Sequence, residues 1–124
     1  MIEGTVSSRR EAIIPLTVFA ADGLPETFEA VVDTGFTDFV TLPARVIDRL
    51  SLTPAAPLEG MLADGSIIEV MLFRASVLWD GVQRAVFVVA AEGKILVGMS
   101  LLYGYDFLMQ TMDGGAVRIS QSIT

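Results

Sequence analysis

Glycine turns divide this 124-residue sequence into short runs that are rich in β-branched and apolar residues. Three of these turns contain the Asp-Gly pairs Asp22-Gly23, Asp64-Gly65 and Asp80-Gly81. An Asp-Gly pair between two such runs is typical of a β-hairpin, because glycine adopts a positive φ at little cost. The sequence therefore predicts a mainly β protein, and its length predicts one domain over residues 1–124.

The expected strands cover residues 2–8, 11–19, 27–32, 39–42, 58–63, 66–73, 75–79, 82–90, 95–97 and 116–119. Pro15 interrupts the second run, so that strand is expected to be an edge or to be bulged there. The run Ile95 to Val97 is apolar on both faces, which predicts a central strand.

Two short helices are also expected. Pro43 suits the first position of a helix, and Val46, Ile47 and Leu50 follow at helical spacing. Residues 100–109 carry apolar side chains at i, i+1, i+4 and i+7, which predicts a second helix. Residues 51–57 contain two prolines and are expected to be a loop.

Composition excludes several kinds of chemistry. The chain is 52% hydrophobic and 19% charged, as in folded domains. It contains no cysteine and no histidine, which excludes thiol nucleophiles, Ser-His-Asp triads and HExxH metal sites. Asp106 and Asp113 match no metal-binding loop. Catalysis is expected to use carboxylates, hydroxyls and backbone groups, with no metal and no cofactor.

The pattern of charged and apolar residues argues against nucleic-acid and membrane partners. The formal net charge is −7, and the eight basic residues form no stripe that could neutralise phosphates. Residues 1–5 lack the features of a signal peptide. The longest apolar stretch, 85–91, is far shorter than the ~20 residues of a membrane helix. We therefore expect a cytoplasmic protein without nucleic-acid or membrane partners.

The segment Val31-Val32-Asp33-Thr34-Gly35 contains a carboxylate, a hydroxyl and a glycine backbone, which are the kinds of group that the composition leaves for catalysis. A carboxylate at the end of an apolar strand is costly to bury unless hydrogen bonds compensate it. Gly35 leaves its N–H free to bond that carboxylate and lets another backbone approach. On these residues alone, a strand end followed by an Asx turn or β-turn is the simpler interpretation.

The flanking segments change that interpretation. After Ala30 to Gly35 come a strand over 40–43 that leads into a helix, a glycine-tipped hairpin at 62–66, and the run Ile-Leu-Val-Gly-Met-Ser-Leu-Leu at 95–102. In this order the chain resembles the retropepsin-like aspartic proteases, and more closely their small bacterial relatives with Phe after Asp-Thr-Gly. The resemblance implies a mainly β, retropepsin-like single-lobe barrel with one or two short helices.

The resemblance also implies roles for particular residues. Asp33, Thr34 and Gly35 would be catalytic. The implied substrate-binding residues are Phe36, Ala63, Asp64, Gly65, Ser66 and Gly98. Ala63 to Ser66 would form a flap over bound peptide, and Gly98 is expected beside Asp33.

An aspartic protease needs two carboxylates that share one proton. This chain has one Asp-Thr-Gly. The resemblance therefore implies an endopeptidase that is active as a homodimer on peptide or protein substrates, with Asp33 from each copy on the twofold axis. Thr34 would lock the two loops together across that axis.

Two positions depart from the family's pattern. Phe36 stands where Ala or Ser is usual, and Met99-Ser100 stand where viral members have Arg followed by Asn or Asp. Two other functions stay open. One is a non-catalytic retropepsin-like module for peptide binding or dimerisation. The other is a structural β-barrel in which Asp33 caps a turn.

Overall fold

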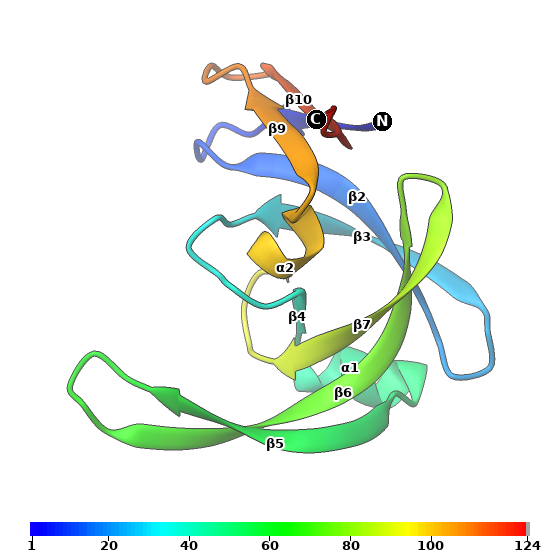
Figure 1. The fold of residues 1–124 in the computed structure, drawn as a ribbon, viewed down its shortest axis with the longest axis vertical. Helices are drawn as coiled ribbons and strands as arrows, with labels where there is room; N and C mark the ends of the chain where they lie inside the picture. The colour runs from blue at the N-terminus through cyan, green and yellow to red at the C-terminus, as the bar shows by residue number, and fades with distance from the viewer. Residues whose placement is uncertain (124) are drawn as a thin grey trace.

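The structure, a computed structural model, describes residues 1–123. These residues form ten strands and two short helices (Figure 1). Their order is β1 (Ile2–Val6), β2 (Ala12–Phe19), β3 (Pro25–Val32), β4 (Val40–Leu42), α1 (Ala44–Leu50), β5 (Thr53–Met61), β6 (Ile67–Trp79), β7 (Val82–Ala90), β8 (Leu96–Val97), α2 (Met99–Leu102), β9 (Tyr105–Met109) and β10 (Ala116–Gln121).

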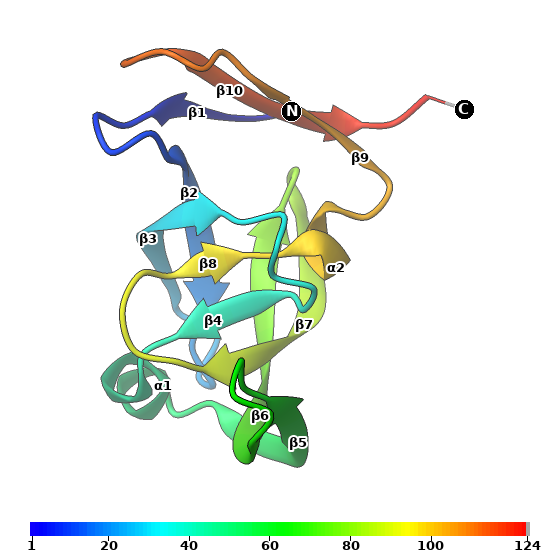
Figure 2. The ribbon, with the colours of Figure 1, turned by 90° about the vertical axis from the view of Figure 1, so that its left-hand side faces the viewer.

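Six of the strands close into a ring. Strands β6, β7, β4, β8, β3 and β2 are neighbours in that order, and β2 pairs again with β6. On one side β5 extends the ring from β6, and on the other β1, β10 and β9 continue from β2. Figure 2 shows these last three strands as a separate layer above the ring. The prediction of a mainly β fold with two short helices is confirmed.

The core lies inside the ring because strand side chains alternate between its two faces. Strand β2 shows the alternation clearly, since its inward residues are buried and those between them are half-buried or exposed; the inward residues are Ala12, Ile14, Leu16 and Val18. The predicted first helix is also confirmed, as α1. Its buried residues, Val46, Ile47 and Leu50, belong to the same core.

Pro15 lies where β2 has a partner on one side only. The pairing of β1 with β2 ends at Ile13, and the pairing of β6 with β2 begins at Thr17. Pro15 itself is exposed and pairs with Glu29 of β3. Because proline has no N–H to donate, it is tolerated at such an edge position, where no second strand needs that hydrogen bond. The expectation of a local edge is confirmed.

The expected loop over 51–57 is wrong, because β5 begins at Thr53. Strand β5 is the outermost strand beyond the ring, so its prolines do not interrupt a second ladder. An irregularity between Pro54 and Ala56 shifts the register with β6. The two strands expected at 66–73 and 75–79 are likewise one continuous strand, β6, which forms a hairpin at each end.

The expected helix over 100–109 is wrong beyond Leu102. Gly104 has a φ of 88° and turns the chain into β9. After this turn half-buried and exposed residues alternate with period two, and β9 pairs with β10. A helical spacing of apolar residues across a glycine turn was therefore fortuitous. Of the two helices in residues 1–123, neither has the length and apolar character needed to cross a membrane.

Candidate active site

Asp33 is the first residue after β3, which is a strand of the ring. Strands β3 and β8 are parallel, and Val32 pairs with Val97. The Asp33 N–H donates to the Val97 carbonyl oxygen at 2.9 Å, so Gly98 follows directly beside Asp33. Strand β8 also pairs with β4, which confirms that it is a central strand. The predicted position of Gly98 next to Asp33 is confirmed.

The Asp33 carboxylate is held by its own turn. Its Oδ1 accepts the Gly35 N–H at 2.9 Å, and the Phe36 N–H donates to the Asp33 carbonyl oxygen at 3.2 Å. A Cβ at position 35 would lie 3.2 Å from that same Oδ1, so a larger residue would press on the carboxylate. Asp33 is half-buried and Thr34 is exposed. The turn thus fixes the carboxylate and leaves it partly open to solvent.

Glycine is required at position 98 because the structure leaves no room for a side chain there. A Cβ at this position would lie 2.2 Å from the Asp38 carbonyl oxygen, 2.5 Å from Phe36 Cδ2 and 2.7 Å from the Phe36 carbonyl oxygen. Its φ of −106° is open to any residue, so conformation does not demand glycine here. The ring of Phe36 therefore packs over Gly98, within the loop that carries Asp33.

Two residues beside Asp33, Val31 and Leu96, are not among the predicted site residues. Side chains two apart on a strand share a face, so Val31 lies on the same side of β3 as Asp33. Leu96 is in register with Val31 on β8. Both are half-buried, and they add apolar surface next to the carboxylate. Their signal in the sequence is their place two residues before Asp33 and two before Gly98.

The predicted flap is the hairpin of β5 and β6. At its tip Leu62 N–H donates to the Ser66 carbonyl oxygen at 2.8 Å, and Gly65 has a φ of 86°. Ala63 to Ser66 are all exposed. Figure 1 shows the tip reaching out from the ring, on the side where the loop after β3 also lies. The structure thus places the predicted tip residues together, apart from the Asp33 turn.

Asp64 organises this tip. Its Oδ1 accepts the Ser66 hydroxyl at 2.6 Å and the Ser66 N–H at 2.9 Å. These two hydrogen bonds favour the carboxylate form and lower the pKa of Asp64 below its ordinary value of 3.8. The side chain of Ser66 therefore stabilises the turn chiefly when Asp64 is ionised.

The two faces of this hairpin differ in character. Cross-strand pairs share a face. On one face Leu58 pairs with Val70 and Gly60 with Ile68, so that face is apolar. On the other face Glu59 lies directly opposite Glu69, between the apolar pairs Pro57–Met71 and Met61–Ile67. Both faces of the hairpin are thus largely apolar, and one of them also carries a pair of carboxylates.

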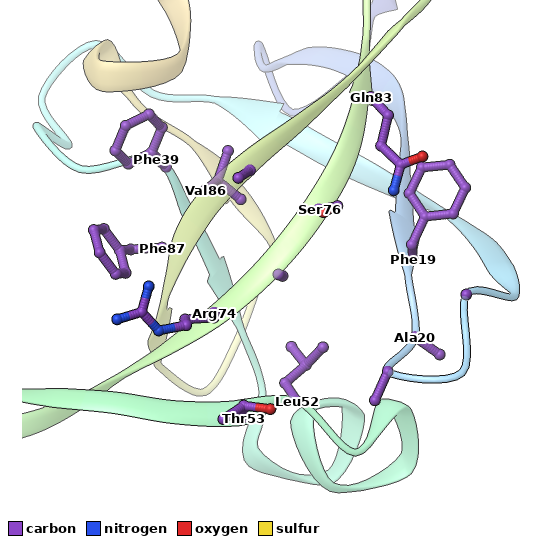
Figure 3. Close-up of a pocket in the computed structure, with 14 residues that line it drawn as sticks. Phe19, Ala20, Phe39, Leu52, Thr53, Arg74, Ser76, Gln83, Val86 and Phe87 are labelled. Carbon is purple, nitrogen blue, oxygen red and sulfur yellow. The ribbon is translucent and has the colours of Figure 1, made fainter.

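A cavity of about 480 Å³ lies at the base of the hairpin. Its lining includes Phe19, Arg74, Gln83 and Phe87, and it does not include Asp33. Figure 3 shows Arg74 beside Phe87, and the Arg74 guanidinium carbon is 5.7 Å from the Phe87 ring centroid. The carboxylate turn and the cavity are thus two separate places, and only the turn carries a group for acid–base chemistry.

The closed ring, the Asp33 turn at the end of β3 and the projecting hairpin together match a retropepsin-like fold. The chain is similar in structure to a crystal structure of a retropepsin-like aspartic protease from Rickettsia conorii, with a TM-score of 0.53. The match covers 98% of this chain and 92% of that chain at 19% sequence identity. No protein-family model and no curated protein matches the sequence.

Proposed function

We propose that this protein is an aspartic endopeptidase that acts as a homodimer on peptide or protein substrates in the cytoplasm. The observation that carries the proposal is the Asp33 carboxylate, held by the Gly35 N–H at the end of a central strand and beside Gly98. The retropepsin-like fold supports it, as does the Asp-Thr-Gly sequence at residues 33–35, on which the resemblance to aspartic proteases rests.

A single chain supplies one carboxylate, and the reaction needs two. In a twofold dimer, Asp33 of each copy would meet on the axis and the pair would hold one proton. The ionised carboxylate takes a proton from water, and the resulting hydroxide adds to the peptide carbonyl carbon. The protonated carboxyl gives its proton to the carbonyl oxygen. The tetrahedral diol then collapses: the amine nitrogen takes the proton that the first carboxylate removed from water, the C–N bond breaks, and one diol hydroxyl returns a proton to the second carboxylate.

In this proposal the other predicted site residues support catalysis by Asp33. The Gly35 N–H orients the Asp33 carboxylate, and the exposed Thr34 is free to contact the second copy. The substrate would bind in an extended conformation, and the tip at Ala63 to Ser66 would close over it. The Phe36 ring packs over Gly98, within the loop that carries Asp33.

The test is cleavage of a diverse peptide library by the wild type and by Asp33→Asn over a range of pH. Asp48→Asn is the matched control, since Asp48 is an exposed residue of α1. We expect the wild type and Asp48→Asn to cleave the same peptides and Asp33→Asn to cleave none. Unchanged cleavage by Asp33→Asn would contradict the proposal. A wild type that binds peptides without cleaving them would favour the non-catalytic module.

A further inference from the structure

Four successive backbone carbonyls after the Asp-Thr-Gly turn each accept a hydrogen bond from residues 98–100. The pairs are Phe36 O with Met99 N at 2.8 Å, Thr37 O with Ser100 Oγ at 2.6 Å, Asp38 O with Ser100 N at 3.2 Å, and Phe39 O with Gly98 N at 2.9 Å. We call these four hydrogen bonds the seam. The seam joins the loop that carries Asp33 to the start of α2.

The seam is the second of two attachments on either side of Asp33. On the strand side, the Asp33 N–H donates to the Val97 carbonyl oxygen. On the loop side, the Phe36 N–H returns to the Asp33 carbonyl oxygen, and the Phe36 carbonyl oxygen then enters the seam. The position of the carboxylate therefore depends on α2 keeping its place.

Helix α2 is too short to keep that place unaided. It contains four residues, and a single turn is unstable without tertiary contacts. Its residues are Met99, Ser100, Leu101 and Leu102, none of which is basic. Any guanidinium that contacts this helix must come from another element.

Arg84 of β7 provides that guanidinium. It is half-buried and donates to the Leu101 carbonyl oxygen at 3.3 Å and to the Ser100 carbonyl oxygen at 3.5 Å. Its guanidinium carbon also lies 5.5 Å from the centroid of the Phe39 ring. A cation is favoured at helix C-terminal carbonyls and over an aromatic face. One side chain therefore contacts both partners of the seam, α2 through Ser100 and the loop through Phe39.

We propose that Arg84 is a positioning residue for Asp33, which acts by holding α2 and the loop 36–39 together at the seam. The proposal rests on the proposed function for its catalytic consequence. Lysine is a poor replacement, because it lacks the planar fork that reaches two carbonyls at once.

The first test is independent of activity and measures amide hydrogen exchange in the full-length protein. In Arg84→Met, which keeps an unbranched apolar stem, we expect the Met99 and Ser100 amides to exchange about tenfold faster. Ser100→Ala removes the Thr37 hydrogen bond and is expected to speed exchange at the same amides. The amide of Val77 in β6 is the reference. The control variant is Arg45→Met, which removes an exposed arginine of α1.

Two exchange results would overturn the proposal. One is exchange at the Met99 and Ser100 amides in Arg84→Met that equals exchange in Arg45→Met. The other is an equal acceleration at Val77, because Arg84 would then stabilise the whole fold without positioning the loop.

The second test separates kcat from KM on a peptide that the wild type cleaves. Displacing a catalytic group lowers kcat, so in Arg84→Met we expect kcat to fall about tenfold or more while KM stays within about threefold. Arg84→Lys is expected to recover part of the loss. A rise in KM at constant kcat would overturn the positioning role. If the wild type cleaves no peptide, the proposed function fails, and the exchange measurements still decide whether Arg84 holds the seam.

Discussion

The ring of Phe36 lies so close to Gly98 that a Cβ at position 98 would come within 2.5 Å of Phe36 Cδ2. The same Cβ would meet the backbone oxygens of Phe36 and Asp38 at 2.7 Å and 2.2 Å. The loop that carries Asp33 is thus packed directly on the glycine that ends β8. This contact explains why a bulky residue follows Asp-Thr-Gly without disturbing the turn.

Gly98→Ala is expected to destabilise the protein by about 1–3 kcal/mol or more, because the added methyl group overlaps backbone atoms that have no room to move. Gly60→Ala is the matched control. A Cβ at Gly60 meets only Ile68 Cγ1, at 3.8 Å, which is ordinary contact. Urea unfolding of both variants measures the difference, and equal midpoints would show that the close approach at Gly98 is wrong.

Thr41→Val tests a buried hydrogen bond below the active site. Thr41 Oγ1 accepts the Leu96 N–H at 2.9 Å and donates to the Lys94 carbonyl oxygen at 3.4 Å. Valine keeps the shape and leaves the Leu96 N–H without this acceptor, so we expect a loss of about 1–3 kcal/mol in the free energy of unfolding.

Thr27→Val serves as the control for Thr41→Val. Thr27 is exposed on β3, and its hydroxyl pairs with that of Thr17 at 2.7 Å. We expect a change within about 0.5 kcal/mol, as for most surface positions. Chemical denaturation that ranks Thr27→Val as the more damaging change would contradict the account.

The hairpin tip should loosen in strong acid. Since the folded pKa of Asp64 lies below its unfolded value, its favourable contribution is present above that unfolded value and is lost as the pH falls through the folded pKa. Ser66→Ala removes the larger cause of the shift and should raise the pKa of Asp64 toward 3.8. An NMR titration of the carboxyl group measures both, and an unchanged midpoint in Ser66→Ala would refute the assignment.

Peptide cleavage is expected to follow a bell-shaped dependence on pH with its optimum on the acid side of neutral. Two facing carboxylates are competent only while they hold one proton between them. The chain contains no histidine, which removes the usual source of a limb near pH 6. A profile that rises steadily through neutral and alkaline pH would require another acid or base.

Features with a short-range cause could be predicted from the sequence. The Asp-Gly turns, the apolar run of β8 and the strand–helix junction at Pro43 all appear in the structure near their expected positions. The Gly35 N–H bond to Asp33 follows from the turn alone. The proximity of Asp33 to Gly98 could be predicted from the resemblance and from the apolar character of residues 95–97.

Features that depend on long-range pairing could not be predicted. Whether residues 53–57 form a strand depends on β6 being available as their partner. Whether residues 105–109 form a helix depends on β10. The contact of Arg84 with Leu101 of α2 joins residues that are 17 positions apart in the sequence, and no local pattern marks it. Such contacts exist only once the ring has closed.

Mixing wild-type and Asp33→Asn chains tests the central claim most directly, because the claim is that Asp33 is half of an active site. With equal amounts of the two chains allowed to exchange, random pairing gives about a quarter wild-type dimers, so activity should fall to about a quarter of that of the same total of wild-type chain. Activity of about a half would mean that each copy works alone. That result would contradict the shared pair of Asp33 carboxylates.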